Sequence, residues 1–268
     1  MHSEKIRETG GVRCLTFDNL TGQGIIHGFT LRSGGVSTAP YDTFNLGFHV
    51  GDSPQHVLEN RRRLAEALGY HPEHVVAGEQ VHKTAVSVVD ADMRGRGHAS
   101  SGDAVAATDG LVCMEPGIVL MAHSADCTIL FFHDPVLHCI GLAHAGWRGA
   151  VADMSRAMVE TMHGLGCLRE NIRVALSPSV GPCCYQIGEP VIEKIAPGLR
   201  GKVISVRDGN SFLDLAGLQR LQLMQAGIPG QNITRSAYCT NCRDDLFFSY
   251  RASGGQTGRM AGVISLLK

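Results

Sequence analysis

The chain has 268 residues, of which 44% are hydrophobic and 18% are charged, and its formal net charge is −1. This length and composition are those of a folded protein with a sizeable core. A near-neutral charge offers no electrostatic basis for binding nucleic acid or an anionic membrane. No apolar run approaches the roughly 20 residues that span a bilayer. The polar start, Met1-His-Ser-Glu-Lys, lacks the apolar core of a signal peptide, so we expect a cytoplasmic protein.

The hydrophobic pattern predicts a strand pair first and a helix after it. The helix is expected to begin at Pro54, with Ser53 as its N-cap, and to stop at Gly69. A second long helix is predicted over 148–164, with Met154 and Met158 facing inward. The predicted strands cover 12–17, 25–31, 85–89, 110–114, 119–123, 129–132, 139–143, 172–176 and 260–266. Shorter helices are predicted over 189–195 and 213–226, and a mobile loop near the site over 94–108.

Many strands with interspersed helices, but without regular βαβ alternation, favour an α+β fold with a mixed sheet. No internal repeat and no low-complexity linker divides the sequence. We therefore expect one domain over residues 1–268.

Three segments each bring one possible metal ligand to the end of an apolar strand. His82 ends Gly78-Glu-Gln-Val-His82, Cys127 follows Asp126, and His144 is delivered to a glycine-rich turn that carries Arg148. Two histidines and one cysteine can form a three-ligand zinc site with a fourth position open. Their spacing has no local zinc-finger pattern, so the tertiary fold would have to assemble the site. Taken singly, each is also typical of a structural histidine or a buried thiol.

Several motifs together resemble the YfiH/YlmD family, a bacterial group once labelled laccase-domain or polyphenol oxidase proteins. The motifs are Glu79-Gln-Val-His82, Ala125-Asp126-Cys127, Ala143-His144-Ala-Gly-Trp-Arg148-Gly, Gly181-Pro-Cys-Cys-Tyr185, Phe248-Ser-Tyr-Arg251 and Thr257-Gly-Arg259. The match runs in order from about residue 45 to the C-terminus.

The resemblance implies a zinc-dependent purine nucleoside phosphorylase that also deaminates adenosine. The implied substrates are adenosine, inosine, guanosine and methylthioadenosine, cleaved with phosphate to the free base and the (methylthio)ribose 1-phosphate. The implied metal ligands are His82, Cys127 and His144. The implied fold is a mixed-sheet α/β sandwich of the kind seen in a cytotoxic-necrotizing-factor toxin domain.

Phosphorolysis and deamination of a nucleoside require further residues besides the metal ligands. Asp126 and then Glu79 are the candidates for the general acid/base. Arg148, Arg251 and Arg259 are candidates for holding phosphate, because arginine forks suit phosphate oxygens. Asn45 could bind the ribose or the base, or could only shape a turn. Arg61 is a weaker candidate for phosphate binding, and a surface ion pair is expected for it instead.

The remaining cysteine motifs are Cys239-Thr-Asn-Cys242 and the adjacent pair Cys183-Cys184. A second zinc site would need two more ligands at suitable spacing, and the sequence has no second C-x-x-C. These residues are therefore predicted to be packing cysteines, with a place in the pocket lining possible for Cys183, Cys184 and Cys239.

Other functions remain open at this point. Two histidines and a cysteine also suit copper, and a copper-dependent polyphenol oxidase is one alternative, although the sequence lacks the His-x-His pairs of a multicopper oxidase. A metal-free cysteine hydrolase, with Cys127 as nucleophile and His144 or His82 as base, is another. A non-catalytic metal or nucleoside sensor is a third. No G-x-G-x-x-G or Walker motif indicates a nucleotide cofactor, and the sequence predicts no oligomeric state.

Overall fold

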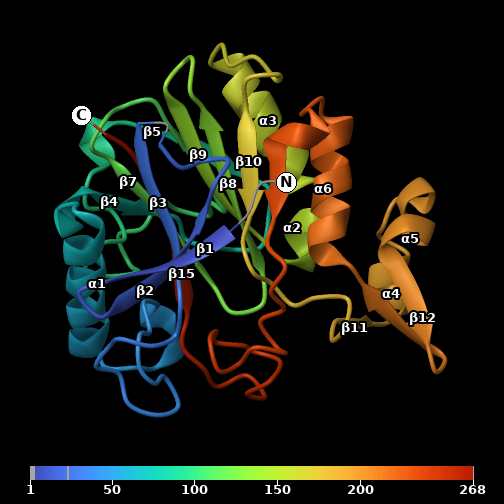
Figure 1. Cartoon of the computed structure of the whole chain (residues 1–268), viewed down its shortest axis with the longest axis horizontal. Coiled ribbons are helices and arrows are strands. Elements are labelled where there is room, and N and C mark those ends of the chain that lie inside the picture. Colours follow the sequence, from blue (N-terminus) through green and yellow to red (C-terminus); the bar gives the residue numbers. More distant parts are fainter. Residues whose placement is uncertain (1–3, 23, 268) are drawn as a thin grey trace.

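The computed structural model describes residues 4–22 and 24–267, and its centre is a pair of six-stranded sheets packed face to face (Figure 1). The first sheet has the order β1-β2-β3-β15-β7-β4. Its strands are β1 (Glu4–Thr9), β2 (Val12–Phe17), β3 (Ile25–Thr30), β15 (Met260–Leu266), β7 (Val119–Ser124) and β4 (Val75–Ala77). Only the β4–β7 pair is parallel.

The second sheet has the order β14-β10-β8-β9-β6-β5. Its strands are β14 (Ile233–Arg235), β10 (Arg173–Leu176), β8 (Thr128–Asp134), β9 (Cys139–Ala145), β6 (Gly110–Cys113) and β5 (Val86–Val89). The outer pairs β10–β14 and β5–β6 are parallel and the inner pairs antiparallel, so this sheet is also mixed. A small antiparallel sheet holds β11 (Gln186–Ile187), β13 (Asn210–Leu213) and β12 (Ile204–Arg207).

Helices cover the outer face of each large sheet (Figure 1). The helices are α1 (Pro54–Leu68), α2 (Trp147–Val151), α3 (Met154–Gly164), α4 (Glu189–Ile192), α5 (Pro197–Val203) and α6 (Leu215–Gln225), with 3-10 turns at Phe48–Val50, Pro72–His74, Ala91–Met93 and Gly230–Asn232. In the described part of the chain, none of them combines the length and apolar character that crossing a bilayer requires.

Two kinds of apolar contact hold these layers together. Between the sheets, aromatic and aliphatic side chains such as Phe29 and Phe131 form one buried cluster. On the outer faces, Leu64 of α1 packs against the first sheet, and Met158 of α3 and Leu223 of α6 pack against the second. The result is the mixed-sheet α/β sandwich that the family resemblance implied.

The long apolar strands match their predicted ranges to within a few residues, because their burial on both faces leaves continuous apolar runs. The edge strand β1 was not predicted. Its sequence, Glu-Lys-Ile-Arg-Glu-Thr, is polar and mostly exposed, and only backbone pairing with β2 makes it a strand.

The single helix predicted over 148–164 is wrong, because the structure divides it into α2 and α3. Asp153 interrupts the helix with a positive φ of 64°, and its side chain accepts a hydrogen bond from the backbone N–H of Arg156. Asp favours such capping over a helix interior position because its short carboxylate competes for backbone N–H groups. The break lets α3 lie along the sheet while α2 stays next to the end of β9.

Two glycines let α3 approach the second sheet closely. A Cβ at Gly110 would lie 2.8 Å from the Met158 sulfur, and one at Gly141 would lie 2.7 Å from its terminal methyl carbon. Met158 therefore fills a groove that these two strand positions leave open, and it is fully buried there.

We predict that Met158→Ala lowers the free energy of unfolding by about 2–5 kcal/mol, because it leaves a cavity between α3 and the sheet that close neighbours cannot fill. Denaturant unfolding measures the change. Val136→Ala, at a side chain that is 69% exposed, is the control and should change it by less than about 0.5 kcal/mol. Equal effects of the two substitutions would contradict this account of the packing.

Candidate active site

A cavity of about 670 Å³ opens where strands from both sheets end. Strands β4, β7 and β9 each deliver residues to it at their carboxyl ends, and loops from distant parts of the sequence complete its wall. Gly97, Ser101 and Ala104 also line it, so the 94–108 segment lies next to the site as predicted. A cavity of this size suits a small organic ligand.

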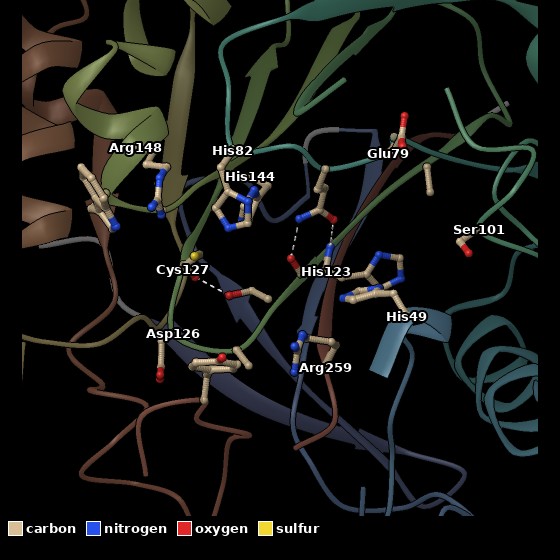
Figure 2. Close-up of a pocket in the computed structure, with 18 of the residues that line it drawn as sticks. His49, Glu79, His82, Ser101, His123, Asp126, Cys127, His144, Arg148 and Arg259 are labelled. Carbon is tan, nitrogen blue, oxygen red and sulfur yellow. Dashed lines mark hydrogen bonds between the residues drawn. The ribbon is translucent and has the colours of Figure 1, made fainter. Parts of the chain in front are cut away.

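His82, Cys127 and His144 come together in this cavity. Their ligand atoms all lie within 4.8 Å of one another, and the two imidazole rings are nearly perpendicular with centroids 4.8 Å apart. Figure 2 shows the Cys127 sulfur facing the two rings. Residues from three separate elements thus form the group of possible ligands that the sequence predicted.

Local backbone geometry places two of these side chains. Cys127 lies in the tight turn between β7 and β8, where Asp126 has a φ of 89° and the Ser124 hydroxyl donates to the Cys127 carbonyl. His82 itself has a φ of 59°. Positive φ at residues other than glycine is uncommon and is often found where function requires it.

Asp109 organises the histidine side of the site. One carboxylate oxygen lies 2.9 Å from Nδ1 of His144, and the two oxygens accept backbone N–H groups of residues 81–83, each at 3.0 Å. Burial opposes ionisation of this carboxyl, but the hydrogen bonds from His144 and the backbone keep the pKa of Asp109 below its ordinary value. Nε2 of His144 is thereby left free for a metal ion, as in carboxylate–histidine–metal sites.

Gly146 is required by the close approach of the ligands. A Cβ at this position would lie 2.6 Å from the Cys127 sulfur and 3.5 Å from the His82 ring. Any side chain there would displace the thiol, so the glycine directly after β9 serves the site and not only the turn.

Cys127 and His144 form a charged pair. Burial by itself would raise the pKa of Cys127, but the charge and hydrogen bond of His144, with a hydrogen bond from His82, lower it to about 6. Burial would lower the pKa of His144, but the Cys127 thiolate and Asp109 raise it to about 9. Cys127 is therefore a thiolate at neutral pH, which is the form that binds metals.

The donor set fits a metal ion of borderline or soft character. One thiolate and two imidazole nitrogens suit zinc and copper alike, and three protein ligands leave room for a further group. The buried Asp109 carboxylate behind His144 supplies the outer hydrogen bond that such sites use.

The three arginines expected to hold phosphate all line the cavity. Each guanidinium lies over an aromatic ring: Arg148 over Trp147 at 4.4 Å, Arg251 over Tyr185 at 5.1 Å and Arg259 over Tyr250 at 5.9 Å. In residues 4–22 and 24–267, no carboxylate forms an ion pair with any of them. Their positive charge is therefore available to an anion.

The prediction that Arg61 forms a surface ion pair is wrong. Its side chain is buried, and its donors go to the backbone oxygens of residues 46, 97 and 98 and to Nε2 of His123. Burial lowers the pKa of Arg61 to about 10, so it is still charged at neutral pH. A helix residue can be turned inward in this way when carbonyl groups of neighbouring loops satisfy the guanidinium, which the helix pattern does not reveal.

Asp126 and Glu79 both line the cavity, but their partners differ. Both Asp126 oxygens accept hydrogen bonds, one from the Thr240 hydroxyl at 2.6 Å and one from the Arg251 backbone N–H at 2.8 Å. Glu79 is exposed, and one of its oxygens accepts the backbone N–H of Ala107. Asp126 thus ties its own turn to two points of the segment between β14 and β15, whereas Glu79 keeps an oxygen that faces no donor among the described residues.

Asn45 lies outside the cavity lining and is 0% exposed. Its amide accepts the backbone N–H groups of Gly47 and Arg259 and donates to Asp52. Asn45 therefore positions the backbone of Arg259, and direct contact with ribose or base does not fit this placement.

Three residues that sequence reasoning left without a role belong to the site. They are Asp109, His49 and His123. The position of Asp109, a carboxylate directly before the strand that starts at Gly110, was a sequence signal that could have identified it. No comparable sequence signal identified His49 or His123. The pKa of His49 is lowered to about 4 by burial and by Arg259 and Arg61, so it is neutral at physiological pH.

Comparison with known proteins gives consistent results. The model of a family described as multi-copper polyphenol oxidoreductase laccase matches residues 26–267. The chain is 39% identical over 248 residues to purine nucleoside phosphorylase YlmD of Geobacillus stearothermophilus, with 90% of each covered. It is 33% identical to adenosine deaminase RL5 of an unknown prokaryotic organism, covering 82% of this chain and 85% of the relative. The crystal structure of hypothetical protein YfiH from Bacillus licheniformis superimposes with a TM-score of 0.93 at 34% identity, covering 98% and 99% of the two chains.

We predict that alkylation of Cys127 in metal-free protein is half-maximal near pH 6, since the thiolate reacts and its pKa is lowered to about 6. Peptide mass spectrometry after iodoacetamide treatment at a series of pH values measures it. His144→Ala removes the cation that stabilises the thiolate and should shift the midpoint upward by several pH units. An unchanged midpoint in that variant would contradict the charged pair.

Proposed function

This chain belongs to the YfiH/YlmD family, and from that membership we propose that it is a purine nucleoside phosphorylase that uses a zinc ion at His82, Cys127 and His144. The reaction consumes a purine nucleoside and phosphate and yields the free base and ribose 1-phosphate. The observation that carries the proposal is the presence of the three ligand side chains and three unpaired arginines in one cavity of nucleoside size.

Arg259, Arg148 and Arg251 are proposed to bind the phosphate. Two hydrogen bonds of the Arg259 guanidinium go to backbone carbonyls of residues 257 and 258, which hold it without neutralising it. Figure 2 shows Arg259 and His49 on one side of the ligand group and Arg148 on another. Cations from two directions suit a phosphate that must be held next to the sugar.

Arg61 lines the same cavity and supports the site through its hydrogen bonds. Its Nη2 donates to Nε2 of His123, so the proton of that neutral imidazole is on Nδ1. Burial lowers the pKa of His49 and of His123, and the buried charge of Arg61 lowers both further, which keeps the two rings neutral. Arg61 is thus a positioning residue, because the backbone oxygens and His123 take up its donors.

The metal site contributes electrostatic stabilisation. When bound, an ion at this site supplies Lewis-acid stabilisation of negative charge in the reacting groups. The protein's own part is to hold the three donors together through the Asp109 hydrogen bonds and the turn at Gly146.

Protons are proposed to move through Glu79, with Asp126 in a positioning role. Asp126 was the first expectation for the general acid/base, but each of its oxygens already accepts a hydrogen bond that ties a loop to the site. Glu79 lines the same cavity with one oxygen without a described donor. A group that exchanges protons with substrate needs such a free lone pair.

Deamination of adenosine at the same site is proposed as a second activity. A relative that carries the name adenosine deaminase supports it, and the same ligand group would serve it. Methylthioadenosine is proposed as an additional phosphorolysis substrate, in line with the implication of the family resemblance.

One observation favours a competing function. The Cys127 thiolate next to a cationic His144 is also the arrangement of a cysteine nucleophile with its base. The same pair is what a metal site needs before the ion binds. Dependence on metal therefore separates the two.

We predict that zinc-loaded protein forms adenine when incubated with adenosine and phosphate, and that it forms inosine from adenosine without phosphate. Chromatographic separation of adenine, inosine and hypoxanthine measures both. Cys127→Ala should lose the zinc of the His82, Cys127 and His144 site and all product formation while thermal unfolding stays cooperative, because one of the three ligands of that site is removed.

The matched control is Cys14→Ala, which removes a buried thiol outside the cavity lining. Full product formation by metal-free protein would contradict the metal mechanism and favour the cysteine hydrolase. Oxidation of phenols in air by copper-loaded protein, without any nucleoside product, would favour the polyphenol oxidase.

A second prediction concerns Asp126→Asn. The amide can still accept from the Arg251 backbone N–H and donate to the Thr240 hydroxyl, so a positioning role predicts that kcat falls less than about tenfold. A proton-carrying role predicts a loss of about 10²–10⁴. Glu79→Gln should show the larger loss. Steady-state phosphorolysis rates of the two variants measure this, and the reverse order would return the acid/base role to Asp126.

A further inference from the structure

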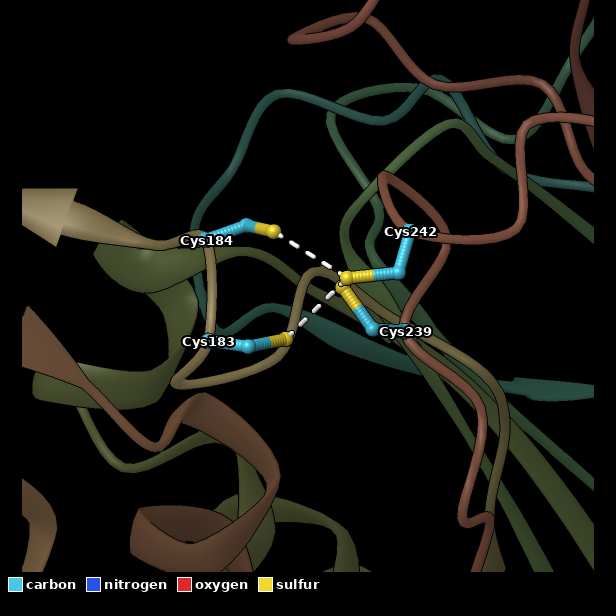
Figure 3. A group of neighbouring side chains, drawn as sticks. All are labelled: Cys183, Cys184, Cys239 and Cys242. Carbon is cyan, nitrogen blue, oxygen red and sulfur yellow. Dashed lines mark hydrogen bonds between the residues drawn. The ribbon is translucent and has the colours of Figure 1, made fainter.

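Four cysteines that the motifs left without a function meet at one point outside the cavity. They are Cys183, Cys184, Cys239 and Cys242, whose sulfur atoms all lie within 4.8 Å of one another (Figure 3). We propose that they form a second, structural zinc site with four thiolate ligands. This proposal stands on the geometry of these side chains and does not depend on the proposed enzymatic function.

The sulfur positions suit a tetrahedral ion. Cys242 Sγ lies 3.4 Å from Cys183 Sγ and 3.3 Å from Cys184 Sγ. Four thiolates at the usual zinc–sulfur distance of about 2.3 Å have sulfurs about 3.8 Å apart, close to this arrangement. Only a small adjustment of side chains is needed to bind the ion.

The backbone supports a thiolate at Cys239. The Gly181 N–H donates to Cys239 Sγ at 3.1 Å from the opposite loop. Backbone N–H groups of Asn241 and Cys242, two and three residues further along the C-x-x-C turn, also donate to this sulfur. N–H donors of this kind stabilise a thiolate.

The prediction that these four residues are packing cysteines is wrong, because two of their side chains are exposed to solvent. Packing cysteines in this chain, such as Cys14 and Cys167, are buried, whereas Cys183 and Cys242 are exposed. A thiol that only fills space belongs in an apolar core. None of the four lines the cavity, so the pocket-lining alternative is not met either. Sequence spacing missed the cluster because the adjacent pair and the C-x-x-C are far apart along the chain.

Disulfide bonding accounts for the cluster less well. All four cysteines are free, and Cys242 lies nearly equally close to Cys183 and Cys184. A disulfide from Cys242 to one of them would leave the other to pair with Cys239, so the four sulfurs would have to separate into two pairs. A four-ligand ion uses the observed arrangement, with all four sulfurs close together.

The proposed ion would hold together two loops of the cavity wall. The first loop leads into Tyr185, and the second contains Thr240, whose hydroxyl donates to Asp126. The two loops already touch through the Thr240 N–H, which donates to the Ser179 carbonyl. Four metal–sulfur bonds at the outer end of this contact would fix the wall, which agrees with a closed structural site rather than a catalytic one.

The test is the metal content of untagged protein purified under reducing conditions. In a Cys127→Ala background, which empties the first site, we expect one zinc per chain to remain. Adding Cys183→Ser and Cys242→Ser should remove that equivalent, while adding Cys14→Ala as the control should not. Both serine positions are exposed, so the substitutions leave the core intact.

Cobalt substitution supplies a readout that does not require the serine variants to fold. Cobalt added to the metal-free Cys127→Ala protein should give the intense sulfur-to-metal charge-transfer absorption of four thiolates. No bound metal in that protein, iron in place of zinc, or fewer than eight free thiols in the denatured, unreduced chain would each overturn the proposal. Because Cys127 is absent throughout, failure here is distinct from failure of the proposed phosphorylase.

Discussion

The site depends on one buried carboxylate. Asp109 lies directly before β6 and reaches both the His82 loop and the end of β9, through backbone N–H groups and through His144 Nδ1. Its backbone carbonyl also accepts the His144 N–H at 2.8 Å. Because every ligand histidine is held through this residue, the shape of the ligand group follows from it. A buried carboxylate is stable here since each oxygen is hydrogen-bonded.

Charge is distributed unevenly around the cavity, and this explains what it can bind. Arg61, Arg148, Arg251 and Arg259 have no carboxylate partner in the described parts of the chain, while the neighbouring His49 is kept neutral by burial and by the charges of Arg259 and Arg61. Arg61 is buried and Arg259 is half-buried, whereas Arg148 and Arg251 are exposed. A buried cation without an opposite charge is costly unless polar groups or an anion stabilise it. This excess of positive charge beside His82, Cys127 and His144 agrees with the phosphate site proposed above.

The two cysteine-containing clusters differ in a way that indicates different roles. The first has three donors at the wall of a cavity and an open side, whereas the second has four sulfurs from two loops and lies outside the cavity. Metal sites with chemistry to perform keep a position open, and structural sites close it. The loops that carry the second cluster also hold Asp126, so the two are mechanically connected through Thr240.

Sequence alone determined the buried strands, α1 and the three candidate ligand residues His82, Cys127 and His144, because apolar runs, capping residues and motif order are local properties. It could not determine that Asp109 orients His144, that Arg61 turns inward, that Asn45 serves Arg259, or that four cysteines meet. Each of these joins residues far apart in the chain, and hydrogen bonds and approach distances between such residues exist only after the sheets have packed. The sequence thus specified the reactive groups, and the tertiary structure decided which of them act together.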